Sequence, residues 1–276
     1  MKKIHLLPNL VTACGMTCGL FVIFKMATIP AELITEETLI AISGFLLLAA
    51  FFDLLDGALA RAMQAESEFG GLFDSLADTI SFGVAPSLIF LKIQPYDPGT
   101  PYSFFITSAA LTFSVSGVLR LVRFNVNANK IKGNAELEKA NKQNFTGLPI
   151  PAAAACAVSL ILFTYSVSDS PFFNPTYLQC SAMIFLGYLM ISRLKFPSPK
   201  TLQMRVNSFR SVFIVVLLSV ILFYGLLHHF PLLFFLLSWS YLTISLILSF
   251  IRILAGRRSK KLEAFEPEPD EIEDEL

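Results

Sequence analysis

The chain has 276 residues, of which 54% are hydrophobic and 15% are charged, and its mean hydropathy is +0.64. A soluble domain of this length carries about 25% charged residues, so the composition excludes a disordered chain and argues against an ordinary soluble globular enzyme. The net charge of zero hides an uneven distribution, because residues 263–276 hold eight of the 21 acidic residues and no Lys or Arg. We therefore predict an all-α integral membrane protein, with a polytopic domain over residues 1–262 and an acidic, disordered cytoplasmic tail over residues 263–276.

A helix needs about 20 apolar residues to cross the hydrocarbon core of a bilayer. By this criterion the sequence predicts about eight transmembrane helices. They cover residues 9–28, 36–55, 70–92, 103–124, 149–167, 174–193, 210–228 and 231–252. The first stretch follows Lys2 and Lys3 as a signal peptide would, but no small-residue cleavage site follows it, so we interpret it as a span.

The basic residues indicate the orientation, because Lys and Arg prefer the cytoplasmic side of a membrane. With the amino terminus inside, 19 of the 21 Lys and Arg residues are cytoplasmic or lie at that interface, and Lys25 and Lys92 lie on the far side. Eight spans return the carboxyl terminus to the cytoplasm as well. We expect a protein of the bacterial cytoplasmic membrane with both termini inside.

Four acidic residues lie close to the membrane on two successive predicted helices. Asp53 and Asp56 are three residues apart at the end of the second span, and Asp74 and Asp78 are four residues apart at the start of the third. Each pair therefore shares one helix face. The linking turn, residues 65–71, is short and ends in two glycines, so the helices are predicted to be antiparallel neighbours. The four carboxylates are expected to converge at the cytoplasmic interface.

Carboxylates that lie this close repel one another unless a cation sits among them. Oxygen ligands without His or Cys favour Mg²⁺, Mn²⁺ or Ca²⁺ over zinc, and carboxylate-bound Mg²⁺ is typical of sites that handle phosphates. Gly57 and Ala60 lie beside the acids and leave room for a ligand, and Arg61 supplies a cation suited to phosphate. A solvated helix end would be the ordinary explanation of a single acid, but acids at membrane depth are usually functional.

These residues form a pattern with fixed spacing: Asp53-x2-Asp56-Gly57-x2-Ala60-Arg61-x8-Gly70-x3-Asp74-x3-Asp78. The pattern resembles the signature of the CDP-alcohol phosphatidyltransferases. The resemblance implies that a CDP-linked lipid donates its phosphatidyl group to an alcohol and that CMP leaves. It also implies that the four aspartates hold two divalent ions, Mg²⁺ or Mn²⁺, on the pyrophosphate. In the same way it implies that Asp78 is the general base, that Gly57, Ala60, Arg61 and Gly70 contact the nucleotide donor, and that the protein is a homodimer.

Further segments resemble the phosphatidylserine synthase branch of this family. They are PNLVT at 8–12, CG at 18–19, SFGVAPS at 81–87, LRLVRFNV at 119–126, FTGLPIP at 145–151 and FPS at 196–198. One position departs from the pattern, because Gly15 stands where that branch is expected to have Asn. This departure argues against carrying over a family role to position 15 of the first span, and it leaves the aspartate motif intact.

The acceptor site is predicted from two arginines and an amide. Arg120 and Arg123 are three residues apart at a cytoplasmic helix end, where they can bind the carboxylate of serine or a lipid phosphate. Anchoring of the helix by positive charge on the inner side is the alternative interpretation of both. Asn125 can add a hydrogen bond to the acceptor.

The resulting prediction is an enzyme that transfers a phosphatidyl group from CDP-diacylglycerol to L-serine, with membrane lipids around it and no nucleic acid as a partner. Three alternatives stay open. The acceptor of the same reaction can be glycerol phosphate, inositol phosphate or choline. The carboxylates can instead be the ion path of a cation transporter, although transporter sites usually lie near the bilayer midplane between repeated halves. The third alternative is an inactive lipid-binding scaffold.

Overall fold

The structure is a computed structural model that describes residues 6–63, 67–95, 99–131, 144–167, 175–192, 194–197 and 229–256. Its elements follow in chain order: α1 (Leu6–Thr28), η1 (Ala31–Leu33), α2 (Glu36–Ala62), α3 (Glu68–Asp78), η2 (Thr79–Val84), α4 (Ala85–Ile93), α5 (Pro101–Ile131), β1 (Asn144–Thr146), α7 (Ile150–Ser166), α8 (Pro175–Ile191), β2 (Lys195–Pro197) and α10 (Phe230–Gly256). The two strands have three residues each, so the predicted all-α class is confirmed.

Each predicted span that falls on described residues coincides with a helix. Within the described ranges, the helical segments long and apolar enough to cross a membrane are Leu6–Thr28, Glu36–Ala62, Glu68–Ile93, Pro101–Val126 and Phe230–Ile251. α7 and α8 are apolar but shorter, with 17 residues each. The predicted span 210–228 and the acidic tail 263–276 lie outside the described residues. The total of about eight spans and the cytoplasmic position of both termini therefore remain predictions.

The third span differs from its prediction at its beginning and in its middle. The sequence predicts that the linking turn ends in Gly70–Gly71, but α3 already begins at Glu68 and both glycines lie within it. The reason is a helix cap: the Ser67 hydroxyl accepts a hydrogen bond of 3.0 Å from the backbone N–H of Gly70. In the middle of the span, α3 continues without a break into η2, a π-helical turn, and then into α4.

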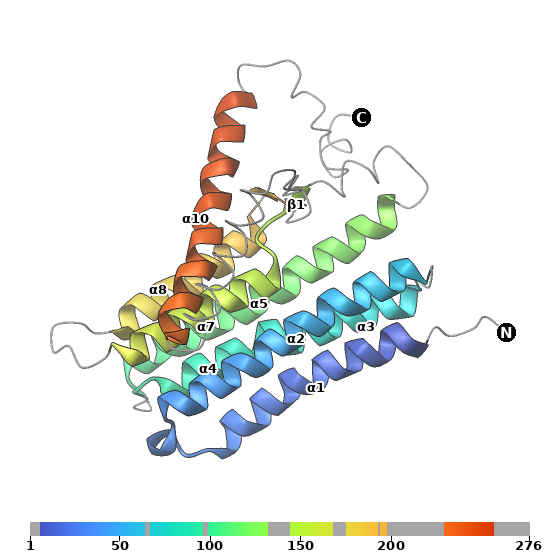
Figure 1. Cartoon of the computed structure of the whole chain (residues 1–276). Helices are drawn as coiled ribbons and strands as arrows, with labels where there is room; N and C mark the ends of the chain where they lie inside the picture. Colours follow the sequence, from blue (N-terminus) through green and yellow to red (C-terminus); the bar gives the residue numbers. More distant parts are fainter. Residues whose placement is uncertain are drawn as a thin grey trace, which may run out of the picture.

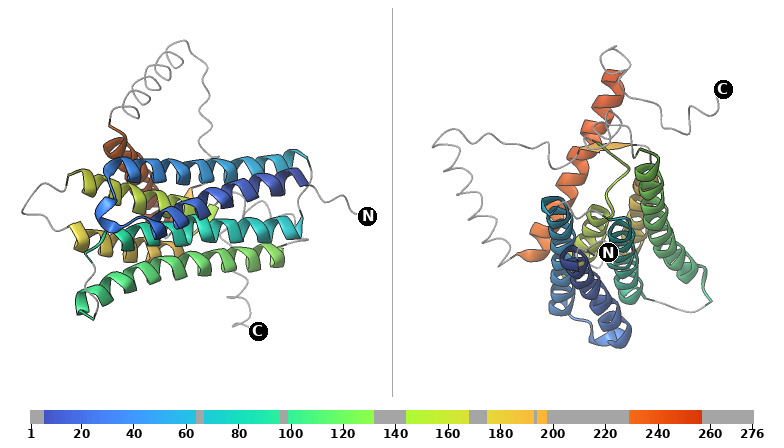
Figure 2. Two further views of the ribbon diagram at one scale, coloured as in Figure 1. Left: turned by 90° about the horizontal axis from the view of Figure 1, so that it is seen from below. Right: turned by 90° about the vertical axis from the view of Figure 1, so that its right-hand side faces the viewer.

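The helices α1 to α5, α7 and α8 lie side by side in one bundle, and α10 crosses the bundle at a steep angle (Figure 1; Figure 2). α1 packs against both α2 and the α3–α4 rod, α2 runs antiparallel to both of these, and α5 returns beside the rod (Figure 1). The amino terminus of α1 and the α2–α3 turn share one end of the bundle (Figure 1). This is the end at which the acidic pairs lie.

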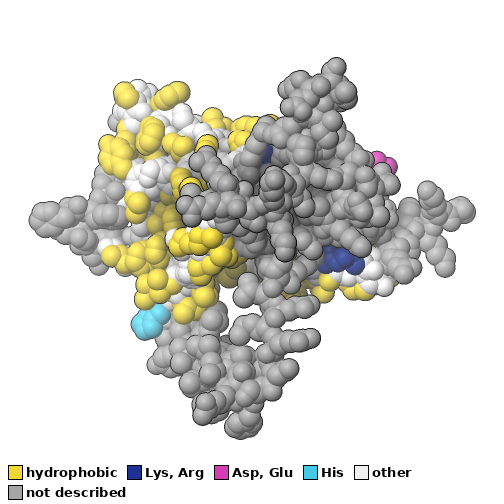
Figure 3. All heavy atoms as spheres, turned by 90° about the horizontal axis from the view of Figure 1, so that it is seen from above, with side chains coloured by type: hydrophobic (Ala, Val, Ile, Leu, Met, Phe, Trp, Pro, Cys, Tyr) yellow, Lys and Arg dark blue, Asp and Glu magenta, His cyan; other side chains and the backbone are white. Residues whose placement is uncertain are grey.

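α7 is the most buried helix of the bundle. Its alanines, including Ala153, Ala154 and Ala157, let neighbouring helices approach closely, and most of its residues are inaccessible to solvent. At the far end of the bundle α7 is tied to the start of α2, because the Tyr165 hydroxyl donates to the carbonyl of Ile34 at 2.7 Å. Apolar side chains spread over the described part of the face seen in Figure 3. Such a surface fits a lipid environment.

Two motif segments that are far apart in the sequence pair as a small antiparallel sheet. Phe145 in β1 is the register partner of Phe196 in β2. Just after β1, Gly147 has φ +79°, and its N–H donates to the carbonyl of Leu194 at 2.8 Å. The pairing fixes where the chain enters α7, next to the carboxyl end of α8.

Candidate active site

The carboxylates of α2 and α3 converge as their spacing predicts. One ligand oxygen each from Asp53, Asp56 and Asp74 lies within 4.8 Å of the other two. Asp56 is the most enclosed of the three, with 5% of its surface exposed. The short link and the capped start of α3 make the two helices antiparallel, which brings one face of each to the same place.

Asp78 lies one helical turn beyond Asp74 and completes the cluster. All four aspartates line one small cavity of about 10 Å³ between α1, α2 and the α3–η2 rod. A volume of this size holds about one water-sized particle. The donor set consists of carboxylate oxygens, and three of them are close enough to share one ion, so the residues fit a hard divalent cation.

α1 contributes a residue to which the sequence analysis assigns no role. The Thr12 hydroxyl donates to Asp56 Oδ2 at 2.5 Å and lies 3.1 Å from the carbonyl of Pro8. Thr12 is itself buried and lies 44 positions from Asp56. The signal in the sequence was the PNLVT segment, which resembles the family pattern without indicating which residue it contacts.

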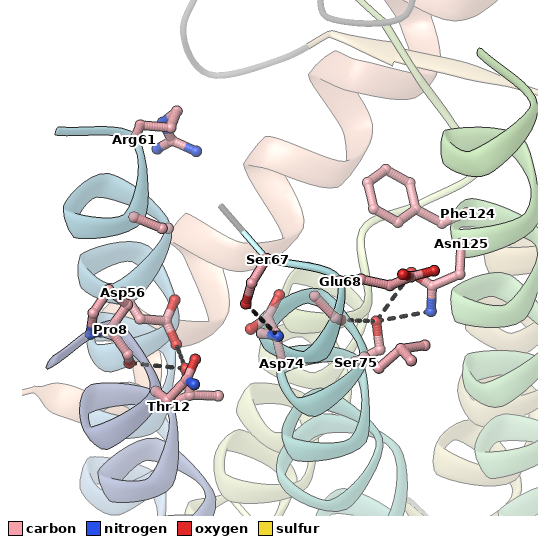
Figure 4. Close-up of a pocket in the computed structure, with 16 residues that line it drawn as sticks. Pro8, Thr12, Asp56, Arg61, Ser67, Glu68, Asp74, Ser75, Phe124 and Asn125 are labelled. Atoms are coloured by element: carbon pink, nitrogen blue, oxygen red, sulfur yellow. Dashed lines mark hydrogen bonds between the residues drawn. The ribbon is translucent and has the colours of Figure 1, made fainter. Parts of the chain in front are cut away.

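A larger cavity of about 600 Å³ opens beside the carboxylates (Figure 4). Its wall comes from four helices and includes every residue predicted for the nucleotide donor. The lining residues are Pro8, Asn9, Thr12, Asp56, Gly57, Ala60, Arg61, Ser67, Glu68, Gly70, Gly71, Leu72, Asp74, Ser75, Phe124 and Asn125. Figure 4 shows Asp56 and Asp74 on opposite sides of the space between α2 and α3, with Arg61 at its outer end.

Two glycines of this region face crowded surroundings. A Cβ on Gly70 would lie 3.0 Å from the Ser67 hydroxyl and 3.1 Å from Asn9 Oδ1, so a side chain there would press into the cavity wall. A Cβ on Gly15 would lie 3.2 Å from Cβ of Phe52. Gly15 also lines the small cavity between the aspartates. A larger residue at position 15 therefore requires Phe52 to move.

The two predicted acceptor arginines occupy different environments. Arg120 is 8% exposed and interacts electrostatically with Asp78, and its Nε has no hydrogen-bond partner among the described residues. Arg123 donates from Nη1 to the carbonyl of Ile191 at 2.7 Å and from Nη2 to that of Ser192 at 3.4 Å, which caps the carboxyl end of α8. Arg120 therefore interacts with the aspartate cluster, whereas the hydrogen bonds of Arg123 go to the carboxyl end of α8.

Asn125, which the sequence predicts to contact the acceptor, lines the large cavity. Its Nδ2 donates to the Ser75 hydroxyl at 3.0 Å, one turn before Asp78 on the neighbouring helix. Figure 4 shows this contact between α5 and α3. Ser75 is a second wall residue that the sequence did not indicate, because nothing local distinguishes it from any other serine in a helix.

A comparison with models of known protein families shows to which family the chain belongs. The model described as CDP-alcohol phosphatidyltransferase matches residues 5–194, which include both acidic pairs and the arginines of α5. The chain belongs to the CDP-alcohol phosphatidyltransferase family. Membership in this transferase family favours an enzyme over the cation transporter and the scaffold that the sequence left open. α10 lies beyond the matched residues.

Curated relatives cover most of the chain. The chain is 31% identical over 223 residues to the CDP-diacylglycerol–serine O-phosphatidyltransferase of Helicobacter pylori strain 26695. The matched residues make up 80% of this chain and 83% of that relative. It is 33% identical over 191 residues to the protein of the same name from Bacillus subtilis, covering 69% and 89%. It is 35% identical over 157 residues to the archaetidylserine synthase of Methanothermobacter thermautotrophicus, covering 55% and 56%.

Proposed function

We propose that the chain transfers the phosphatidyl group of CDP-diacylglycerol to L-serine, giving phosphatidylserine and CMP. The observation that carries this proposal is the cluster of aspartates beside a cavity of about 600 Å³, within the residues that match the family. The relatives from H. pylori and B. subtilis carry serine in their names, which supports L-serine over glycerol phosphate, inositol phosphate or choline.

Asp53, Asp56 and Asp74 would hold a divalent cation, Mg²⁺ or Mn²⁺, and the resemblance to the family implies a pair of ions with Asp78 as a further ligand. When bound, divalent cations neutralise a pyrophosphate and stabilise the departing phosphate. Gly57 and Ala60 leave the wall of α2 open for the donor, and Gly70 does the same for α3. Arg61 at the outer end of the cavity offers its guanidinium to the nucleotide phosphate.

Asp78 would act as the general base. The serine hydroxyl oxygen attacks the phosphorus that carries the diacylglycerol, the bond from this phosphorus to the CMP oxygen breaks, and the hydroxyl proton passes to the Asp78 carboxylate. A positioned base of this kind accelerates such a step by about 10²–10⁴-fold. Arg120 is buried and interacts electrostatically with Asp78, and its Nε has no hydrogen-bond partner among the described residues. It is therefore the better placed of the two arginines for the carboxylate of serine. Asn125 would contact the acceptor from the cavity wall.

The setting of the reaction follows from the solubility of the reactants. The donor lipid stays in the membrane while CMP and serine are soluble, so the site must open at an interface. We infer that this interface is the cytoplasmic one in a bacterial inner membrane, because the positive residues of the sequence favour that side. We also propose a homodimer, as the family resemblance implies.

The test is CMP release by purified protein given CDP-diacylglycerol, Mg²⁺ or Mn²⁺ and one alcohol at a time. Release should require L-serine and metal, and Asp78→Asn should lower kcat by at least about 10²-fold. Glu37→Gln is the matched control and should leave kcat unchanged, because Glu37 is exposed in the first turn of α2, at the opposite end of this helix from Asp53 and Asp56. Release with another alcohol would replace the acceptor and keep the chemistry. No release with any alcohol from folded protein would overturn the proposed function.

A further inference from the structure

The π-helical turn η2 follows Asp78 directly and takes up most of the SFGVAPS segment. Pro86 has no N–H to donate to the carbonyl four residues earlier, and its ring crowds that carbonyl. The backbone widens accordingly, and the N–H of Ala85 donates to the carbonyl of Ile80, five residues before it. π-Helical turns inside α-helices frequently lie at functional sites.

Neighbouring helices pack against η2 on two sides. On the α1 side, a Cβ on Gly19 would lie 2.2 Å from the Ser81 hydroxyl and 2.7 Å from Cα of Ser81. On the α5 side, a Cβ on Gly117 would lie 2.8 Å from Cδ1 of Ile150 and 3.8 Å from Cα of Gly83, the latter an ordinary contact distance. The turn therefore packs tightly against the backbone of α1 and is in ordinary contact with α5.

α5 adds a hydrogen bond to this packing. The Ser114 hydroxyl donates to the carbonyl of Gly83 at 2.9 Å. The Ser87 hydroxyl lies 2.8 Å from that of Ser114 and donates to the carbonyl of Ala110 at 3.1 Å. The Ser87 hydroxyl also lies 3.3 Å from the carbonyl of Gly83, so Ser114 makes the shorter of two side-chain hydrogen bonds to this carbonyl and the one that comes from another helix.

Contacts between α5 and the α3–η2 rod keep one antiparallel register on both sides of Asp78. Asn125 bonds Ser75 one turn before Asp78. Ser114 bonds Gly83 just after Asp78. Asp78 therefore lies on a length of helix that α5 holds at both ends.

We propose that Ser114 is a positioning residue for Asp78: by holding the carbonyl of Gly83, it fixes the π-helical turn and with it the direction of the Asp78 carboxylate. This inference rests on the proposed function, because Asp78 is the base of the proposed reaction. Ser114 touches neither the large cavity nor the small one that the aspartates line. Its effect must then pass through η2.

The experiment compares Ser114→Ala, Ser114→Thr and Ser116→Ala in the full chain. Ser116 is the matched control, because it is buried on the same helix but faces Gly187 of α8. We measure kcat, the KM values for L-serine and CDP-diacylglycerol, and the thermal unfolding midpoint in detergent. A misplacement of a reacting group by about 1 Å costs up to about 10²-fold, so kcat of Ser114→Ala should fall at least about tenfold.

The other readouts separate positioning from stability. Both KM values of Ser114→Ala should stay within about twofold, as expected for a change that acts on the chemical step. Ser114→Thr keeps the hydroxyl and should recover most of kcat, while Ser116→Ala should match the wild type. The unfolding midpoints of the two alanine variants should agree. A kcat of Ser114→Ala within about twofold of wild type, or a loss shared by Ser116→Ala, would overturn the proposal.

A second readout distinguishes this proposal from the proposed function. If wild-type protein releases no CMP with any alcohol, the proposed function fails. The Mn²⁺ affinity, measured by electron paramagnetic resonance, then tests whether Ser114 positions Asp78. Ser114→Ala should then bind Mn²⁺ at least about threefold more weakly than Ser116→Ala, since a support outside the ligand set commonly changes affinity by 10-fold or more. Equal affinities would reject the positioning role.

Discussion

At the scale of single residues, the carboxylate cluster depends on hydrogen bonds from helices that carry none of its aspartates. Thr12 of α1 donates to Asp56, and Asn125 of α5 bonds Ser75 beside Asp74. Partners of this kind orient metal ligands, and their loss typically costs 10–100-fold in metal affinity. Thr12 thus orients one aspartate of the candidate site directly, and Asn125 ties α5 to the helix that carries Asp74.

Replacement of Thr12 by Val keeps the shape of the side chain and removes the hydrogen bond to Asp56. We expect Thr12→Val to raise the Mn²⁺ concentration for half-maximal CMP release by about 10-fold or more. Thr17→Val is the control, because Thr17 lies on the same helix, is exposed, and bonds only the carbonyl of Ala13 among the described residues. An unchanged Mn²⁺ requirement in Thr12→Val would show that Asp56 needs no orienting partner.

At the scale of elements, α1 and the α3–α4 rod approach through glycine. Gly19 faces Ser81 so closely that a Cβ would require the backbone of η2 to shift. Gly44 of α2 has no atom within 4 Å of the corresponding position. Gly19 therefore lies in a crowded position and Gly44 in an open one, so alanine at these two positions should have different effects on stability.

Gly19→Ala should destabilise the protein by about 1–3 kcal/mol, the range of overpacking in a well-packed interior. Gly44→Ala should be neutral or add about 0.5–1 kcal/mol, because alanine loses less backbone freedom than glycine in a helix. Thermal unfolding in detergent measures both. Equal midpoints for the two variants would contradict the close approach of α1 to η2.

At the scale of the whole molecule, apolar and charged surfaces indicate how the bundle sits in the membrane. Apolar side chains form large patches on the described part of the face in Figure 3, and the acidic cluster lies at the end that holds the α2–α3 turn. η1 lies at the opposite end, between α1 and α2. The positive residues of the sequence favour the α2–α3 end as the cytoplasmic one.

Cysteine labelling tests this orientation. In a chain without its four native cysteines, Glu32→Cys in η1 and Met63→Cys after α2 present exposed thiols at opposite ends of α2. A maleimide that does not cross membranes should label Glu32→Cys in intact spheroplasts and Met63→Cys only after the membrane is broken. The reverse pattern would invert the predicted topology.

Local sequence features were sufficient for the spans and for the acidic pairs. Hydropathy and residue spacing are properties of one helix, so the described spans and the shared faces of Asp53–Asp56 and Asp74–Asp78 were predictable. The short link between α2 and α3 also made their convergence predictable. The early start of α3 was missed because the Ser67 cap outweighs the low helix propensity of Gly70 and Gly71.

The remaining parts of the site depend on which helices pack together. Thr12 reaches Asp56 across 44 residues, and Ser75 meets Asn125 across 50. Arg120 and Arg123 look equivalent in the sequence, yet one interacts with Asp78 and the other caps α8. The sequence by itself determined the membrane class, the acidic motif and its family. Only the tertiary structure decided the partners of those acids, because contacts between distant helices depend on the packing of the entire bundle and have no signature in either segment alone.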